Sequence, residues 1–240
     1  MNSYLRYRTA EWLLAGSRRA RAFSLVRSSV RPKLVNPDTQ IVLEGYPRSA
    51  NSYAFTAFWI SNGQEVPVAH HLHSPVNVEL GVRRGLPVVV FVRDPVDAVA
   101  SLMLRATGMS PSTGLARYIR FHRRLIPLLD EILVAPFETV VTDFGSVMAE
   151  VNKRFQSTFQ IYEPSPENEA RVRHEIEWSQ YVESSQRGIS EHAVPRPSDE
   201  RRQLKPAVTA RVVARSAQIV QARDLYDQMM AVALQPAAGK

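Results

Sequence analysis

The sequence predicts an α/β protein in which a single parallel sheet is flanked by helices. Two short apolar runs rich in β-branched residues, "IVLEGY" (41–46) and "PVVVFV" (87–92), are typical of strands buried on both faces. Weaker strand candidates are "VPVAHHLH" (66–73) and "EILVAPF" (131–137). Helical patterns lie between them, and strands that alternate with helices favour a parallel sheet covered on both faces.

The expected helices follow these strands in chain order. Helical patterns occupy 50–62, 76–85, 95–106, 112–130, 139–156 and 166–186, and a closing helix occupies 206–234. The proline-rich segments "YEPSPE" (162–167) and "AVPRPSDE" (193–200) are typical of loops. Since no repeat and no second type of composition occurs, a chain of 240 residues with 45% hydrophobic content predicts one domain over 41–240.

Residues 1–40 differ from the rest of the chain in charge. They contain eight Lys or Arg against two Asp or Glu, and so carry +6 of the net charge of +7. Aromatic and leucine residues are interspersed, so residues 1–35 of this basic arm can lie on an anionic membrane surface or attract an anionic polymer. The alternative is a solvated basic helix that packs its apolar side on the domain.

Two absences bound the function further. The chain has no cysteine, which excludes disulfides, cysteine-ligated metals and cysteine nucleophiles. No apolar run is long enough to span a bilayer. These properties predict a cytoplasmic protein, which would be peripheral to a membrane if the basic arm binds anionic lipid.

The first strand leads into a loop that suits an anion. The stretch "IVLEGYPRSANSY" (41–53) has the layout of a phosphate-binding loop, with a strand, a tight turn and a helix start. Asn51 occupies the place of the usual Lys, Arg48 supplies a cation instead, and no Asp after an apolar strand offers a magnesium partner. The loop predicts an oxyanion site without a metal, and the alternative is a plain turn that exposes Arg48.

A second segment points to the same edge of the sheet. In "PVVVFVRDPVDAVAS" (87–101), Arg93 stands at the carboxyl end of the strongest strand and Ser101 two turns into the next helix. The Asp-Pro-Val-Asp that follows Arg93 is explained by helix capping alone. Capping does not explain a cation at the strand end, where ligands bind in open α/β sheets.

The two segments together resemble the cytosolic-type and carbohydrate-type sulfotransferases, which use 3′-phosphoadenosine 5′-phosphosulfate (PAPS). The family's 5′-phosphosulfate motif, Pro-Lys-Ser-Gly-Thr-Thr-Trp, is matched by Pro47-Arg48-Ser49-Ala50-Asn51-Ser52-Tyr53. Its 3′-phosphate motif, Arg-Asn-Pro-Lys-Asp-x-x-x-Ser, is matched by Arg93-Asp94-Pro95-Val96-Asp97 and Ser101. The resemblance implies a P-loop-containing, sulfotransferase-like fold.

Further matches to the family are looser. "HLHSP" (71–75) resembles Lys-Thr-His-x-Pro, which places His73 at the general base and His71 at the Lys. "PFETV" (136–140) resembles the Tyr-Glu-Asp-Leu strand end of the family. "QRGIS" resembles the Arg-Lys-Gly loop that closes over the 3′-phosphate, through Arg187 and Gly188.

The sequence departs from the family pattern at three places. Ala50 replaces Gly, which is expected to require a negative φ at that residue. Arg48 replaces Lys, which keeps the charge but changes its reach. His71 replaces the Lys that contacts the leaving group in the family. The resemblance covers about residues 41–190, so the basic arm and the closing helix stay unassigned.

The resemblance implies transfer of a sulfuryl group from PAPS to a hydroxyl or amine of a small-molecule, glycan or lipid-linked acceptor. His73, with His71 as its rival, would take the acceptor's proton, and Arg48 would stabilise the charge that grows on the leaving 5′-phosphate. No metal is expected. Two alternative functions stay open. One is a P-loop kinase for a small molecule or nucleotide, and the other is a non-catalytic protein that binds PAPS or a nucleotide.

Two residue clusters have alternative readings. His70, His71 and His73 can form a metal site, because alternate residues of an extended segment share a face, but no third ligand lies at a supporting spacing. The basic stretch "RYIRFHRR" (117–124) can contact nucleic acid, but it lies in a helix with core residues and has no accompanying nucleic-acid motif. A solvated helix face is therefore expected, without a nucleic-acid partner.

Overall fold

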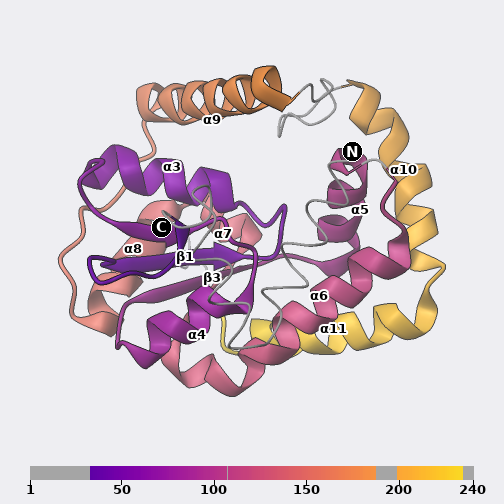
Figure 1. Ribbon diagram of the computed structural model, residues 1–240, viewed down its shortest axis with the longest axis horizontal. Helices are drawn as coiled ribbons and strands as arrows, with labels where there is room; N and C mark the ends of the chain where they lie inside the picture. The colour runs from indigo at the N-terminus through magenta and orange to yellow at the C-terminus, as the bar shows by residue number, and fades with distance from the viewer. Residues whose placement is uncertain (1–32, 107, 188–198, 235–240) are drawn as a thin grey trace, which may run out of the picture.

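The computed structural model describes residues 33–106, 108–187 and 199–234. Within them, four strands form one parallel sheet in the order β2-β1-β3-β4 (Figure 1). The strands are Ile41–Gly45 (β1), Val68–His70 (β2), Val88–Val92 (β3) and Leu133–Pro136 (β4). The predicted α/β class with a single parallel sheet is confirmed, and the two weaker strand candidates are both strands.

Helices follow each strand, largely where the periodicity predicts them. The helices are α3 (Asn51–Asn62), α4 (Pro75–Arg83), α5 (Pro95–Arg105), α6 (Pro111–Leu125), the 3-10 helix η2 (Ile126–Glu131), α7 (Phe137–Thr142), α8 (Phe144–Phe155), α9 (Pro166–Arg187), α10 (Asp199–Val213) and α11 (Ser216–Ala231).

Two predicted helices are each two α-helices in the structure, and the pattern at 112–130 is α6 followed by the 3-10 helix η2. The pattern at 139–156 is interrupted at Asp143, whose backbone leaves the helical region and whose side chain accepts a hydrogen bond from Ser146 N as the cap of α8. The closing helix is divided between α10 and α11, because Arg215 has ψ of 56°. α10 also begins inside the segment 193–200 that was predicted to be a loop, and Pro206 lies within it.

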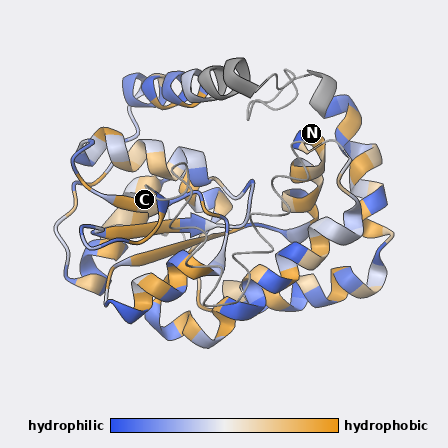
Figure 2. Cartoon of the chain, in the orientation of Figure 1, coloured by the Kyte–Doolittle hydropathy of each residue, from blue (hydrophilic) through white to orange (hydrophobic). Residues whose placement is uncertain are grey.

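Helices cover both faces of the sheet, as the sequence predicts. Val42, Val88 and Val90 face one apolar cluster, which α4, α5, α6 and α11 complete. Their neighbours in the strands face a second cluster with α3, α7 and α8, and this alternation follows the two-residue period of a strand. Figure 2 shows largely apolar strands between helices in which hydrophilic and hydrophobic residues alternate.

The basic stretch 117–124 of α6 is less solvated than the sequence suggests. Arg120 and Arg123 are exposed, as expected for a solvated face, but Arg117 and His122 are buried. His122 Nδ1 lies 2.9 Å from Tyr118 O, so the ring is held by its own helix. Burial lowers the pKa of His122 to about 4, which keeps this imidazole neutral near pH 7.

The basic arm lies almost wholly outside the described residues, which begin at 33, and so does its predicted contact with a membrane or anionic polymer. Gly188 is also outside them, and Arg187 is described only as the last residue of α9. Among the helices that are described, none is long and apolar enough to cross a membrane.

Candidate functional site

The loop between β1 and α3 begins with a tight turn. Ser49 N donates to Tyr46 O at 3.2 Å across Pro47 and Arg48, and Arg48 has φ of 72°. Pro at the second position and a positive φ at the third are the features of a type II turn, in which Gly usually takes the third position. The turn therefore holds Arg48 in a left-handed conformation that costs roughly 1–2 kcal/mol for a residue with a Cβ.

Ala50 is the second left-handed residue of this loop. Its φ is 68°, so the prediction of a negative φ at Ala50 is wrong. The left-handed backbone of Ala50 goes with two local features. Asn51 Nδ2 donates to Tyr46 O at 3.0 Å, and α3 begins at Asn51, directly after the turn. The side chain that replaces the nucleotide-binding Lys thus closes the loop on itself instead of reaching toward a ligand.

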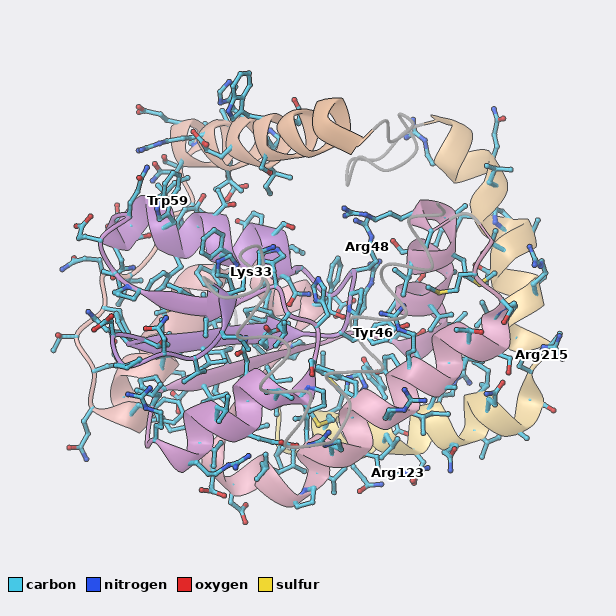
Figure 3. The ribbon with its side chains drawn as sticks, viewed as in Figure 1. Lys33, Tyr46, Arg48, Trp59, Arg123 and Arg215 are labelled. Carbon is cyan, nitrogen blue, oxygen red and sulfur yellow. The ribbon has the colours of Figure 1, made fainter. Side chains whose placement is uncertain are left out.

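The two segments matched to the family motifs contact each other at the ends of β1 and β3. Arg48 Nε donates to Ser101 Oγ at 3.0 Å, and Arg93 Nη1 donates to Arg48 O at 2.8 Å. Figure 3 shows Arg48 beside Tyr46, on the side of the loop that faces α5. Arg48, Arg93 and Ser101, which the sequence predicts to act together, are therefore brought together.

Arg93 is held from several directions. Its guanidinium lies over the Phe137 ring at 4.0 Å, a cation–π contact, and Tyr118 Oη donates to its carbonyl at 2.8 Å. Burial lowers the pKa of Arg93, and Asp97 offsets part of that effect, so the group stays charged at neutral pH. Asp94 caps α5 by accepting from Val96 N and Asp97 N, as predicted.

The remaining residues of the first motif take different places. Ser49 is fully buried, and its Oγ has no hydrogen-bond partner among the described residues. Ser52 Oγ lies 3.1 Å from His71 Nε2. The Tyr53 hydroxyl instead donates to Glu169 Oε1 at 2.6 Å, so it ties α3 to α9. Burial and Glu169 raise the pKa of Tyr53, which keeps it protonated.

The histidines lie on the loop after β2, next to the β1–α3 loop. His70 stacks on Phe55 with ring centroids 3.7 Å apart, and its Nδ1 lies 2.7 Å from His71 Nδ1. His71 Nε2 is the atom that meets Ser52, so both ring nitrogens of His71 have side-chain partners. Burial lowers the pKa of His70 to about 3 and that of His71 well below its usual value.

His73 differs from His71 in how its ring is held. Its Nδ1 lies 3.0 Å from Gly45 O, and because a carbonyl only accepts, Nδ1 must carry the hydrogen. The lone pair of the neutral ring is then on Nε2. Burial lowers the pKa of His73 to about 4, with further contributions from the charges of Lys33 and Arg105. His73 is therefore neutral at pH 7 and can accept a proton at Nε2.

Glu44 is a residue of this site that the sequence analysis missed. It is fully buried in β1, and its carboxylate accepts from Leu72 N at 2.7 Å, His73 N at 3.0 Å and Asn77 Nδ2 at 2.9 Å. Burial raises its pKa to about 7, although these hydrogen bonds partly offset the effect. The signal was a single acidic residue within the apolar run "IVLEGY", which buried strands rarely contain.

The site contains cations and neutral imidazoles. Among the described residues, no group of three or more His, Cys, Asp or Glu is arranged to hold a metal ion. An open surface hollow lies elsewhere, between α6 and α11, and its lining includes Arg120 and Gln218 but none of the matched residues. No protein-family model matches the chain, and no curated protein matches its sequence.

Proposed function

We propose that the protein is a PAPS-dependent sulfotransferase with a P-loop-containing fold. The observation that carries this proposal is the meeting of the two matched segments, through Arg48 Nε with Ser101 Oγ and Arg93 Nη1 with Arg48 O. Arg48 and Arg93 are 45 positions apart and follow the carboxyl ends of the neighbouring parallel strands β1 and β3, and Ser101 lies in α5, the helix after β3. Ligands of open α/β sheets bind at that edge.

The residues present fit a phosphosulfate. The buried Ser49 hydroxyl has no partner among the described residues and can donate to an oxyanion. Arg48 lies at the start of α3, where the positive end of a helix favours an anion. On this proposal, Arg48 and Ser49 hold the 5′-phosphosulfate, and Arg93 and Ser101 hold the 3′-phosphate. PAPS would supply an activated sulfuryl group.

His73 is assigned the role of general base. Its Nε2 carries the lone pair, because Nδ1 is committed to Gly45 O. An acceptor hydroxyl or amine would give its proton to Nε2. A pKa of about 4 makes the ring a weak base, but a bound anion would raise that value by offsetting the positive charges of Lys33 and Arg105. His71, with both nitrogens occupied, is the weaker candidate.

The test is thermal stabilisation by PAP, the desulfated product, compared with ADP and ATP, each with and without magnesium. We expect PAP to stabilise the protein without magnesium and ADP to bind much more weakly. Loss of the charge-assisted contact to the 3′-phosphate should cost roughly 1.5–3 kcal/mol. Equal stabilisation by PAP and ADP would overturn the proposal, and magnesium-dependent stabilisation by ATP would favour a kinase.

A variant at the second motif makes this test specific. Ser101→Ala removes the hydroxyl assigned to the 3′-phosphate and should reduce the preference for PAP over ADP. Ser61→Ala is the matched control, because Ser61 Oγ donates to Ala57 O within α3. Binding of PAP without turnover, in a screen of hydroxyl and amine acceptors with labelled PAPS, would indicate a non-catalytic PAPS-binding protein.

A further inference from the structure

The burial of the Glu44 carboxylate costs free energy unless its hydrogen bonds replace the hydration that it loses. Glu44 lies near the carboxyl end of the inner strand β1 and is fully buried. A buried carboxylate is costly unless hydrogen bonds satisfy its oxygens. Its oxygens accept from three neutral donors, the backbone N–H groups of Leu72 and His73 and the side-chain amide of Asn77. All three donors lie in or just after the histidine loop.

The histidine loop has a backbone that requires such support. His71 and His73 both have φ of 53°, a left-handed conformation that is strained for a residue with a side chain and persists only where the surroundings support it. The N–H groups that Glu44 binds belong to Leu72, between them, and to His73 itself. The carboxylate thus stabilises the strained turn at its centre.

β1 contacts His73 through two consecutive residues. Glu44 accepts from the backbone N–H of His73, and Gly45 O lies 3.0 Å from its ring Nδ1. One contact fixes the backbone and the other fixes the ring, so both are set relative to the loop that starts at Tyr46. Asn77 extends the arrangement, since its amide donates to Lys33 O and accepts from Val35 N.

We infer that Glu44 is a positioning residue that holds the 71–73 turn so that His73 keeps its proton on Nδ1 and presents Nε2 to the acceptor. The part that concerns the acceptor rests on the proposed sulfotransferase function. The part that concerns the tautomer of His73 does not, because it follows from the contacts of β1 with this turn. Asn77 assists by donating to the same carboxylate.

The test uses the whole chain labelled with 15N at its histidines. Nitrogen NMR at pH 7.5 reports which ring nitrogen carries the hydrogen, and the His73 signal is assigned by its loss in His73→Gln. We expect wild-type His73 as a single Nδ1–H tautomer. In Glu44→Gln we expect a population of the Nε2–H tautomer, because a carboxamide must turn an N–H toward one of the three donors. Glu79→Gln on α4 is the matched control and should leave His73 unchanged.

PAP binding is measured on the same proteins. Glu44→Gln should keep PAP affinity within about twofold, since the hydrogen bonds of Glu44 go to Leu72, His73 and Asn77 and not to the residues assigned to the two phosphate groups. Failure of the wild type to bind PAP would contradict the sulfotransferase proposal, and the tautomer result would still decide the role of Glu44. An unchanged His73 signal in Glu44→Gln would overturn the inference.

A variant that fails to fold does not block the test. If Glu44→Gln is unfolded by circular dichroism, the wild-type tautomer decides, because an Nε2–H form of His73 would overturn the inference without any variant. Glu44→Asp then supplies the second comparison. Aspartate keeps the charge but is one methylene shorter, so it cannot reach all three donors and should also give a population of the Nε2–H tautomer of His73. An unchanged His73 signal in a folded Glu44→Asp would contradict the inference.

Discussion

The loops after β1 and β2 share a strained backbone but differ in what holds them. Each contains two residues with side chains and positive φ, Arg48 and Ala50 in the first and His71 and His73 in the second. The first loop is closed largely by its own residues, through Ser49 N and Asn51 Nδ2 on Tyr46 O. The second is held by Glu44 and Gly45, which are 28 and 29 positions away in the chain.

This difference indicates that the two loops of the proposed site take their conformations independently of each other. A loop closed by local contacts can take its shape as soon as β1 and α3 form, and it presents Arg48 from a turn that a short sequence encodes. The histidine loop takes its shape only when β2 is paired with β1 and the Glu44 carboxylate is buried beneath it. Substitutions in the two loops should therefore have separable effects.

The largest effect is expected at His73. Once an acceptor has been identified by screening with labelled PAPS, His73→Ala should lower turnover by ~10²–10⁴ while PAP affinity stays nearly unchanged. His71→Ala is the matched control, with the same backbone conformation but both ring nitrogens committed to side chains. The assignment of the base is wrong if His71→Ala loses turnover and His73→Ala retains it.

The pH dependence of stability should show the buried histidines and Glu44 acting in opposite directions. His70, His71, His73 and His122 have lowered pKa values, so their contribution is full above pH 6.5 and is lost as pH falls toward 4. Glu44 has a raised pKa, so it favours the folded state most below pH 4.5 and least above pH 7.

Because the histidines outnumber Glu44, the free energy of unfolding should fall between pH 6.5 and 4.5, on the order of 1 kcal/mol per pH unit or more. Urea denaturation across this range measures it. Glu44→Gln removes the opposing contribution and should make the fall steeper. A stability that stays level from pH 6.5 to 4.5 would show that these histidines are not kept neutral by burial.

A smaller effect is expected in the β1–α3 loop, at Arg48. Arg48→Ala should lower turnover by more than it weakens PAP binding, because its contact strengthens as charge develops on the leaving phosphate. The loss should correspond to roughly 1.5–3 kcal/mol. Arg48→Lys should recover part of it, and Arg123→Ala on the exposed face of α6 is the control. Unchanged turnover in Arg48→Ala would remove this loop from the site.

The smallest effect concerns the backbone of the same loop. Ala50→Gly should raise the free energy of unfolding by about 0.5–1 kcal/mol, since relief of a left-handed alanine exceeds the entropy that glycine adds to the unfolded chain. Ala54→Gly, in the buried and helical part of α3, should instead lower it by at least about 1 kcal/mol. Denaturation curves of the two variants measure the change in the free energy of unfolding for each. A destabilised Ala50→Gly would contradict the left-handed conformation of this loop.

Much of the fold could be predicted from local patterns. The runs of β-branched residues at 41–46 and 87–92 are strands, and the Asp-Pro start of α5 is capped as expected. The contact between Arg48 and Ser101 was also accessible, because strand ends of a parallel sheet meet at one edge. The break at Asp143 was missed, since a single capping residue inside a continuous helical pattern does not change its periodicity.

What the sequence determined alone is therefore the class of fold, the strands, and the anion-suited turn after β1, because each depends on residues within a few positions of one another. The tertiary structure decided the use of the Tyr53 hydroxyl on Glu169 and the pairing of Glu44 with the histidine loop. These features join residues that are far apart in the chain, and a buried carboxylate or a strained backbone persists only where distant groups satisfy it.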